Sequence, residues 1–287
     1  MSPISETLGI ARIELLRTLR NARVLVLLLL FATSTALVGL VVGLLTRGLD
    51  AQGPEAAAAA SAGILGFLVG DDGGAFQRLS ELPLLVPLVF RVTLFFLPLF
   101  IALLGYDQLS AELSTVSVRY LALRARRGSI LGGKFVAQAL VMWALLAVVI
   151  AGLFVAGAGL RPGVELLPYA GAAGRFWVGG AALAFGYLAL TALSSSMTAS
   201  PGGSLLLNLG ALFAFWLLDG IGGRAAVMHR MGGAASWTEA LRWLSPSAYA
   251  SGVLGSSSAL LTSAAAYAGF GLLFLAAAWA VFRARDI

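Results

Sequence analysis

Six long runs of apolar residues decide the solvent in which this chain folds. Each run is close to the roughly 20 residues that a helix needs to cross the hydrocarbon core of a bilayer. Only 11% of the residues are charged, against about 25% in a typical soluble domain. We therefore expect an all-α, polytopic integral membrane protein whose six transmembrane helices cover residues 24–45, 92–109, 135–156, 176–197, 204–221 and 260–282.

The basic residues indicate how these helices are oriented in the membrane. With the N-terminus in the cytoplasm, the inner segments carry the whole net charge of +6 and the outer segments sum to zero. The reverse orientation would violate the positive-inside rule. Because the number of spans is even, we expect both termini in the cytoplasm. This distribution accounts for the basic balance of the chain, so we expect no nucleic-acid partner.

Residues 1–23 precede the first run and have the pattern of an amphipathic helix. Ile4, Leu8, Leu15 and Leu19 recur at helical spacing, whereas most of the arginines lie off this stripe. Such a helix lies on a membrane surface with its apolar face in lipid and its arginines near lipid phosphates. We therefore expect an interfacial elbow helix that contacts membrane lipids. The alternative is a cytosolic extension of the first transmembrane helix.

Two connections are long enough to carry a function of their own. Residues 110–133 form the one substantial cytoplasmic loop. Residues 222–258 lie outside and contain Trp237, Trp243 and Tyr249, which suit the headgroup layer. We expect short helices in this outer segment, partly buried at the outer membrane face.

The stretch Gly128–Lys134 matches the first seven positions of a phosphate-binding loop, G-x-x-x-x-G-K. That motif also needs a serine or threonine next, where Phe135 stands, and a preceding strand in a soluble α/β domain. Neither requirement is met, so we do not expect ATP to bind here. Lys134 is interpreted as a positively charged anchor at the start of a membrane helix.

No catalytic centre is evident in the sequence. The chain has no cysteine and only one histidine, His229, so neither a zinc site nor a Ser–His–Asp arrangement is indicated. Arg91, Arg175 and Asp219 fall near the predicted helix ends, where snorkelling explains a charge more simply than a transport role does. We therefore expect a transport or scaffold protein that is not an enzyme.

The cytoplasmic loop has the pattern of a docking surface. Apolar residues recur at three- and four-residue steps beside a basic cluster. An amphipathic helix of this kind fits a groove on a partner protein. The cluster also helps to set topology and to bind anionic lipid, and the two roles are compatible. The stripe consists of Leu109, Leu113, Val116, Tyr120 and Leu123, and the cluster of Arg119, Arg124, Arg126 and Arg127.

Short motifs occur in a definite order along the chain. They are Ile10–Arg20 before the first span, Tyr106–Glu112 after the second, Arg119-Tyr120-Leu121 in the loop, Leu131–Lys134 at the third span, Leu244–Tyr249 before the last span, and Phe282–Ile287. In this order, and with six spans, they resemble the ABC-2 type permeases, the membrane subunits of ATP-driven exporters. The single-domain permeases of the NosY and GldF types are the most similar.

This resemblance implies a coupling segment in the cytoplasmic loop, over residues 107–127, that docks on a separate ATPase. The implied coupling residues are Asp107, Glu112, Arg119, Arg124 and Arg127. The resemblance further implies two ATPase subunits and a second permease copy, most simply a homodimer, in a bacterial inner membrane. ATP and Mg²⁺ would bind to the ATPase and no cofactor to this chain, and residues 222–258 would form outer gate helices.

Two other classes of protein stay open at this point. An ion-coupled secondary transporter or channel would place ionisable residues or broken helices inside the membrane. A membrane anchor or assembly subunit would have no transport pathway of its own. The sequence does not identify a substrate, because a fold by itself does not specify what it carries.

Overall fold

A computed structural model describes residues 2–51, 53–69, 73–115, 123, 125–160, 166–231 and 237–285. Within these ranges the chain is helical and contains no strand, which confirms the all-α fold class. Six of the described helices are long and apolar enough to cross a membrane. They are α2 (Ala22–Asp50), α5 (Leu85–Gly105), α8 (Arg127–Leu160), α9 (Leu166–Met197), α10 (Pro201–Arg230) and α12 (Ser257–Ala284).

Most of these helices are longer than the apolar runs from which they were predicted. α8 begins at Arg127 and α10 continues to Arg230, because a helix persists past the membrane edge until a cap or a breaker ends it. Ser200 and Pro201 supply such a boundary, with the Ser200 hydroxyl accepting a hydrogen bond from the amide of Gly203. The second span is the exception, since α5 ends at Gly105 and residues 106–109 form a turn.

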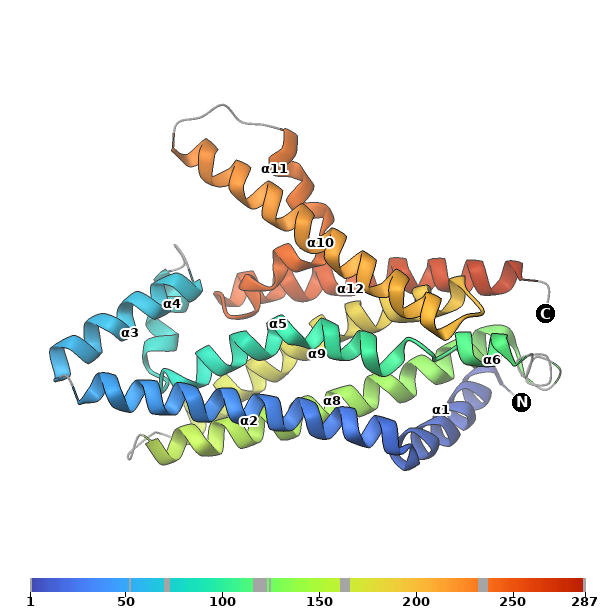
Figure 1. Cartoon of the computed structure of the whole chain (residues 1–287), viewed down its shortest axis with the longest axis horizontal. Coiled ribbons are helices and arrows are strands. Elements are labelled where there is room, and N and C mark those ends of the chain that lie inside the picture. Colours follow the sequence, from blue (N-terminus) through green and yellow to red (C-terminus); the bar gives the residue numbers. More distant parts are fainter. Residues whose placement is uncertain are drawn as a thin grey trace.

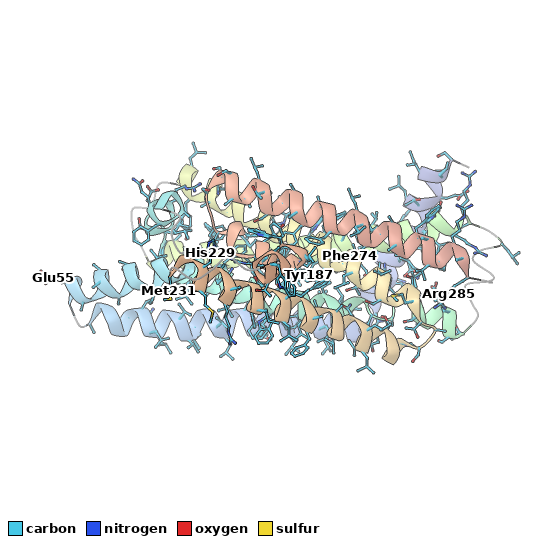
Figure 2. The ribbon with its side chains drawn as sticks, turned by 90° about the horizontal axis from the view of Figure 1, so that it is seen from above. Glu55, Tyr187, His229, Met231, Phe274 and Arg285 are labelled. Carbon is cyan, nitrogen blue, oxygen red and sulfur yellow. The ribbon has the colours of Figure 1, made fainter. Side chains whose placement is uncertain are left out.

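α9 lies at the centre of the bundle and is the most buried of the six spans. It packs along α12 at close range because Gly186 faces the backbone of Tyr267 and Gly271 faces the ring of Phe185. Figure 2 shows Tyr187 and Phe274 inside the bundle and Glu55 and Arg285 toward opposite ends. α2 and α10, by contrast, leave many large apolar side chains exposed, as lipid-facing helices do.

The first helix, α1 (Pro3–Arg20), is capped by the hydroxyl of Ser2 and ends at Asn21. It packs on α8 where that helix carries Gly133, and a Cβ atom at Gly133 would lie 2.7 Å from the side chain of Ile10. Ile4, Leu8 and Leu19 remain exposed, which fits the amphipathic pattern. Its position at a membrane surface stays a prediction.

Different elements lie at the two ends of the bundle (Figure 1). Both termini, α1, the start of α8 and the short helix α6 (Ser110–Ser114) gather at one end, here called the termini end. α3 (Pro54–Val69) and α4 (Gly73–Ser80) lie at the opposite end. In the described part of the connection between α10 and α12, the short helices are α11 (Trp237–Leu241), η1 (Arg242–Leu244), η2 (Pro246–Tyr249) and η3 (Ser251–Val253).

Candidate functional site

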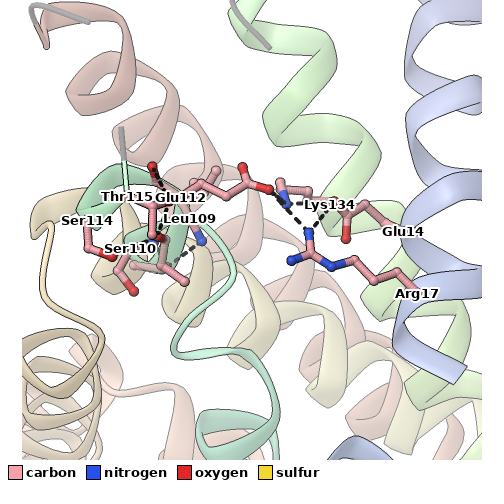
Figure 3. Close-up of polar contacts among 10 residues, drawn as sticks. Glu14, Arg17, Leu109, Ser110, Glu112, Ser114, Thr115 and Lys134 are labelled. Atoms are coloured by element: carbon pink, nitrogen blue, oxygen red, sulfur yellow. Dashed lines mark hydrogen bonds and ion pairs between the residues drawn. The ribbon is translucent and has the colours of Figure 1, made fainter. Parts of the chain in front are cut away.

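Four charged side chains meet at the termini end and form what we call the ion-pair cluster: Glu14 and Arg17 of α1, Glu112 of α6, and Lys134 of α8 (Figure 3). The Lys134 ammonium lies 2.8 Å from Glu14 Oε1 and 2.7 Å from Glu112 Oε1. Arg17 Nη1 lies 3.6 Å from the same oxygen of Glu112. Three helices are therefore joined through one lysine.

The cluster is largely shielded from water. The side chain of Lys134 is 5% exposed and that of Glu112 is 10% exposed, whereas Arg17 is 68% exposed and closes the outer side. Desolvation of two charges is costly, and removing one partner of a buried pair leaves an uncompensated charge. Lys134, predicted as a positively charged anchor at the start of a membrane helix, lies within α8, and its ammonium group lies inside the protein between two carboxylates.

A second contact holds α6 against the centre of the bundle. The backbone amides of Leu109 and Ser110 both donate to the hydroxyl oxygen of Ser195 on α9, at 2.8 and 3.0 Å. These amides belong to the start of α6, where a helix has no internal acceptors for its first N–H groups. The Ser195 oxygen supplies that acceptor and ties α6 to α9.

The start of α8 is held by two further elements. The Glu6 carboxylate of α1 accepts hydrogen bonds from the Ser129 hydroxyl at 3.2 Å and from the Arg126 amide at 3.4 Å. The Arg127 guanidinium donates to the carbonyl oxygens of Arg283, in the last turn of α12, and of Arg285, which caps that helix, at 2.7 and 2.9 Å. Both ends of the segment between α6 and α8 are thus fixed to the bundle.

The coupling residues implied by the sequence occupy different places. Glu112 belongs to the ion-pair cluster, and Arg127 binds the end of α12. Asp107 lines a polar cavity beside the cluster. Arg119 and Arg124 lie outside the described residues. Their common role in coupling stays a prediction. Glu14 and Ser195 take part in these contacts although the sequence did not single them out, and the sequence predicts Lys134 only as an anchor at a helix start.

The polar cavity has a volume of about 110 Å³ and lies between α1, the α5–α6 turn and α8. Gln108 lines it, is 8% exposed, and neither atom of its amide group has a hydrogen-bond partner within the described residues. Gln138 also lines the cavity, and its amide oxygen likewise has no hydrogen-bond partner within the described residues. A cavity with several polar walls suits ordered water. The termini end therefore combines fixed ion pairs with a small polar space.

Comparison with known proteins decides the class. The sequence pattern of a family described as "ABC-2 family transporter protein" matches residues 8–287, which is nearly the whole chain. This chain belongs to the ABC-2 transporter family. It is a multi-pass membrane permease of an ABC transporter. A search of curated protein sequences found no match.

The glycine-rich stretch of this ABC-2 permease serves helix packing. Residues 128–134 all lie in α8, so they form a regular helix where a phosphate-binding loop would be needed. Position 133 requires glycine because α1 passes too close to leave room for a side chain there. Among the described residues, no group of three or more histidine, aspartate or glutamate side chains could hold a metal ion.

Two of the charges inside the spans of this permease have partners nearby. Arg175 of α9 donates to the hydroxyl of Ser257 at 2.8 Å, and Asp219 of α10 accepts from Arg242 at 3.0 Å. Both side chains therefore tie a long helix to the segment around η1–η3 and α12. Arg91 of α5 is half-buried and interacts electrostatically with Asp219 and Tyr267, but forms no hydrogen bond within the described part of the chain.

Proposed function

We propose that this chain is the membrane-spanning permease subunit of an ATP-driven exporter. A separate ATPase would bind ATP and Mg²⁺, and its hydrolysis cycle would drive alternating access and outward movement of a substrate. The match of residues 8–287 to the ABC-2 family carries this proposal. The working unit would contain two ATPases and two permeases, most simply a homodimer, in a bacterial inner membrane with both termini in the cytoplasm.

The ATPase would dock on the segment 107–127. The anchored ends of this segment support that placement, because a push on it would pass to α1 and α8 through Lys134 and to α9 through Ser195. Coupling would use Asp107, Glu112, Arg119, Arg124 and Arg127. Within this set, we assign Glu112 and Arg127 the task of holding the ends of the segment, since both side chains bind inside the chain.

Residues 222–258 would contribute to an outer gate. Gly222 supports this view, because a Cβ atom there would lie 2.8 Å from the backbone nitrogen of Arg242. The Asp219–Arg242 ion pair holds the same contact between α10 and η1. The short helices that follow α10 therefore move with α10 when that helix moves.

Charge reversal tests the docking proposal. Arg119→Glu together with Arg124→Glu is expected to leave membrane insertion intact and to abolish co-purification of an ATPase, since two basic residues of the cluster would become acidic. Arg224→Glu is the matched control, because Arg224 is an exposed arginine outside the proposed docking segment, near the C-terminal end of α10. Unchanged ATPase recovery with the double variant would contradict docking at this segment.

A further inference from the structure

An apolar groove of about 590 Å³ runs along α2 between α5 and α8. Its α2 wall presents Ala36, Gly39 and Gly43, and its α8 wall presents Gly152 and Ala156. Figure 1 shows α2 at the side of the bundle, with α8 and α5 beside it. The volume falls within the range of about 300–1,000 Å³ that is usual for ligand pockets.

Missing side chains create this groove. A Cβ atom at Gly39 would have its nearest neighbour, Val89 Cγ2, at 4.0 Å, and one at Gly152 would meet nothing within 4 Å. These glycines are therefore not required by close helix packing, unlike Gly133. Their effect is to leave room for a chain-like apolar molecule along the helix.

A second cavity, of about 550 Å³, continues the groove toward α3 and α4. Arg47 and Leu85 line both cavities, so the two spaces meet at these residues. The second cavity is more polar, because Thr46, Ser61 and Ser80 contribute hydroxyl groups to its wall. The combined space is apolar along the membrane span and polar at its end.

Arg47 stands at the junction of these two spaces. Its side chain is exposed, and within the described part of the chain it forms neither a hydrogen bond nor an ion pair. A guanidinium group matches the geometry of a phosphate and binds it through two parallel hydrogen bonds. Arg47 lies in the last turn of α2, and the end of a membrane-spanning helix is where lipid headgroups are expected.

We propose that this groove is a binding site for an anionic phospholipid. An acyl chain lies in the groove along α2, the phosphate contacts Arg47, and the headgroup enters the second cavity. The α2 face from Ala32 to Arg47 is about 22 Å long, at about 1.5 Å per residue. One leaflet is about half of the 30 Å hydrocarbon core, so an extended acyl chain fits this length. The proposal goes beyond the transport function and does not depend on an ATPase.

The site is tested by lipid binding to the purified full chain in a neutral detergent. Phosphatidylglycerol and phosphatidylcholine are added in turn, and bound lipid is counted by native mass spectrometry. We expect phosphatidylglycerol to bind more tightly. Arg47→Gln removes a charge-assisted contact to the phosphate and should weaken phosphatidylglycerol about tenfold. It should weaken phosphatidylcholine less, because the choline cation of that lipid already neutralises the charge of its phosphate. Arg224→Gln, at another exposed arginine, should change neither lipid.

Filling the groove provides the second arm. Gly39→Leu and, from the opposite wall, Gly152→Leu should weaken both lipids, because each puts a side chain where the acyl chain lies. Gly210→Leu on α10 is the control, since a Cβ atom there also meets nothing within 4 Å. Thermal melting of each variant separates a filled groove from a misfolded protein, and two independent variants keep the test decisive.

Three results would overturn the proposal. They are equal binding of the two lipids, no effect of Arg47→Gln on phosphatidylglycerol, or no effect of either glycine variant. Displacement of the lipid by millimolar inorganic phosphate would show that the phosphate alone is recognised, which also contradicts a lipid site. None of these results bears on ATPase docking at residues 107–127, so the two proposals fail independently.

Discussion

Replacing Lys134 with methionine removes the cation that joins Glu14 and Glu112 at hydrogen-bonding distance. Methionine nearly keeps the length of the side chain and its flexibility. Two carboxylates whose Oε1 atoms share one ammonium would then face each other without it. Breaking a buried pair by removing one partner costs about 3–5 kcal/mol. We expect about 3 kcal/mol, because Glu14 is 18% exposed and Arg17 remains 3.6 Å from Glu112.

The free energy of unfolding, followed by titration with a denaturing detergent in mixed micelles, measures this loss. Glu112→Gln leaves the Lys134–Glu14 pair in place and should cost less, about 1–3 kcal/mol. The double variant should cost less than the sum of the two single changes, since both remove the same contact. Arg20→Met, at an exposed arginine of α1, serves as the control and should be nearly neutral.

The reasoning about the ion-pair cluster is refuted by either of two results. One is a loss below about 1 kcal/mol for Lys134→Met, which would place the ammonium in water. The other is additivity of Lys134→Met and Glu112→Gln within about 0.5 kcal/mol, which would show that the two groups do not interact.

Two further changes test the packing of the termini end, both measured as the free energy of unfolding. Ser195→Ala leaves two buried amides without an acceptor and should cost about 1–3 kcal/mol. Ser194→Ala should cost less, because the Ser194 hydroxyl donates to the carbonyl oxygen of Leu190 within the same helix, α9. Gly133→Ala drives a methyl group into Ile10 and should cost about 1–3 kcal/mol. Gly159→Ala, in open space on the same helix, should have little effect.

The sequence predicts the spans well because the bilayer imposes a length and a composition on each of them. Every apolar run falls within one of the six candidate membrane spans, and the stripe of α1 is visible in Ile4, Leu8 and Leu19. These are properties of single segments, so no knowledge of neighbouring helices is needed. The family motifs were likewise readable, since they follow one another along the chain.

The ion-pair cluster depends on which helices are neighbours, and periodicity does not carry that information. Lys134 lies 120 residues from Glu14 along the chain and 22 from Glu112. Ser195 lies 86 residues from Leu109. One feature of the sequence could have drawn attention to the cluster. Lys134 is the only lysine in the chain, and the other permanently charged basic side chains are all arginines.

Gly133 illustrates the same limit. Its sequence context resembles a phosphate-binding motif, yet glycine is needed there because of α1. A Cβ atom at position 133 would lie 2.9 Å from the carbonyl oxygen of Thr7 in that helix. The sequence also predicts the start of the fourth span and the end of the fifth span too close to Arg175 and Asp219. Polar residues at the membrane edge continue a helix where no cap intervenes, so both charges lie inside long helices.

Photo-crosslinking from the loop tests the central proposal most directly. A photoreactive amino acid at Leu123, which is 84% exposed in the proposed docking segment, should form an adduct in the membranes of the producing cell. The adduct should contain a protein with an intact phosphate-binding loop. The same group at Leu167, 85% exposed at the start of α9, should form none. Absence of this adduct at Leu123, or equal yields at both positions, would contradict an ATPase docked at residues 107–127.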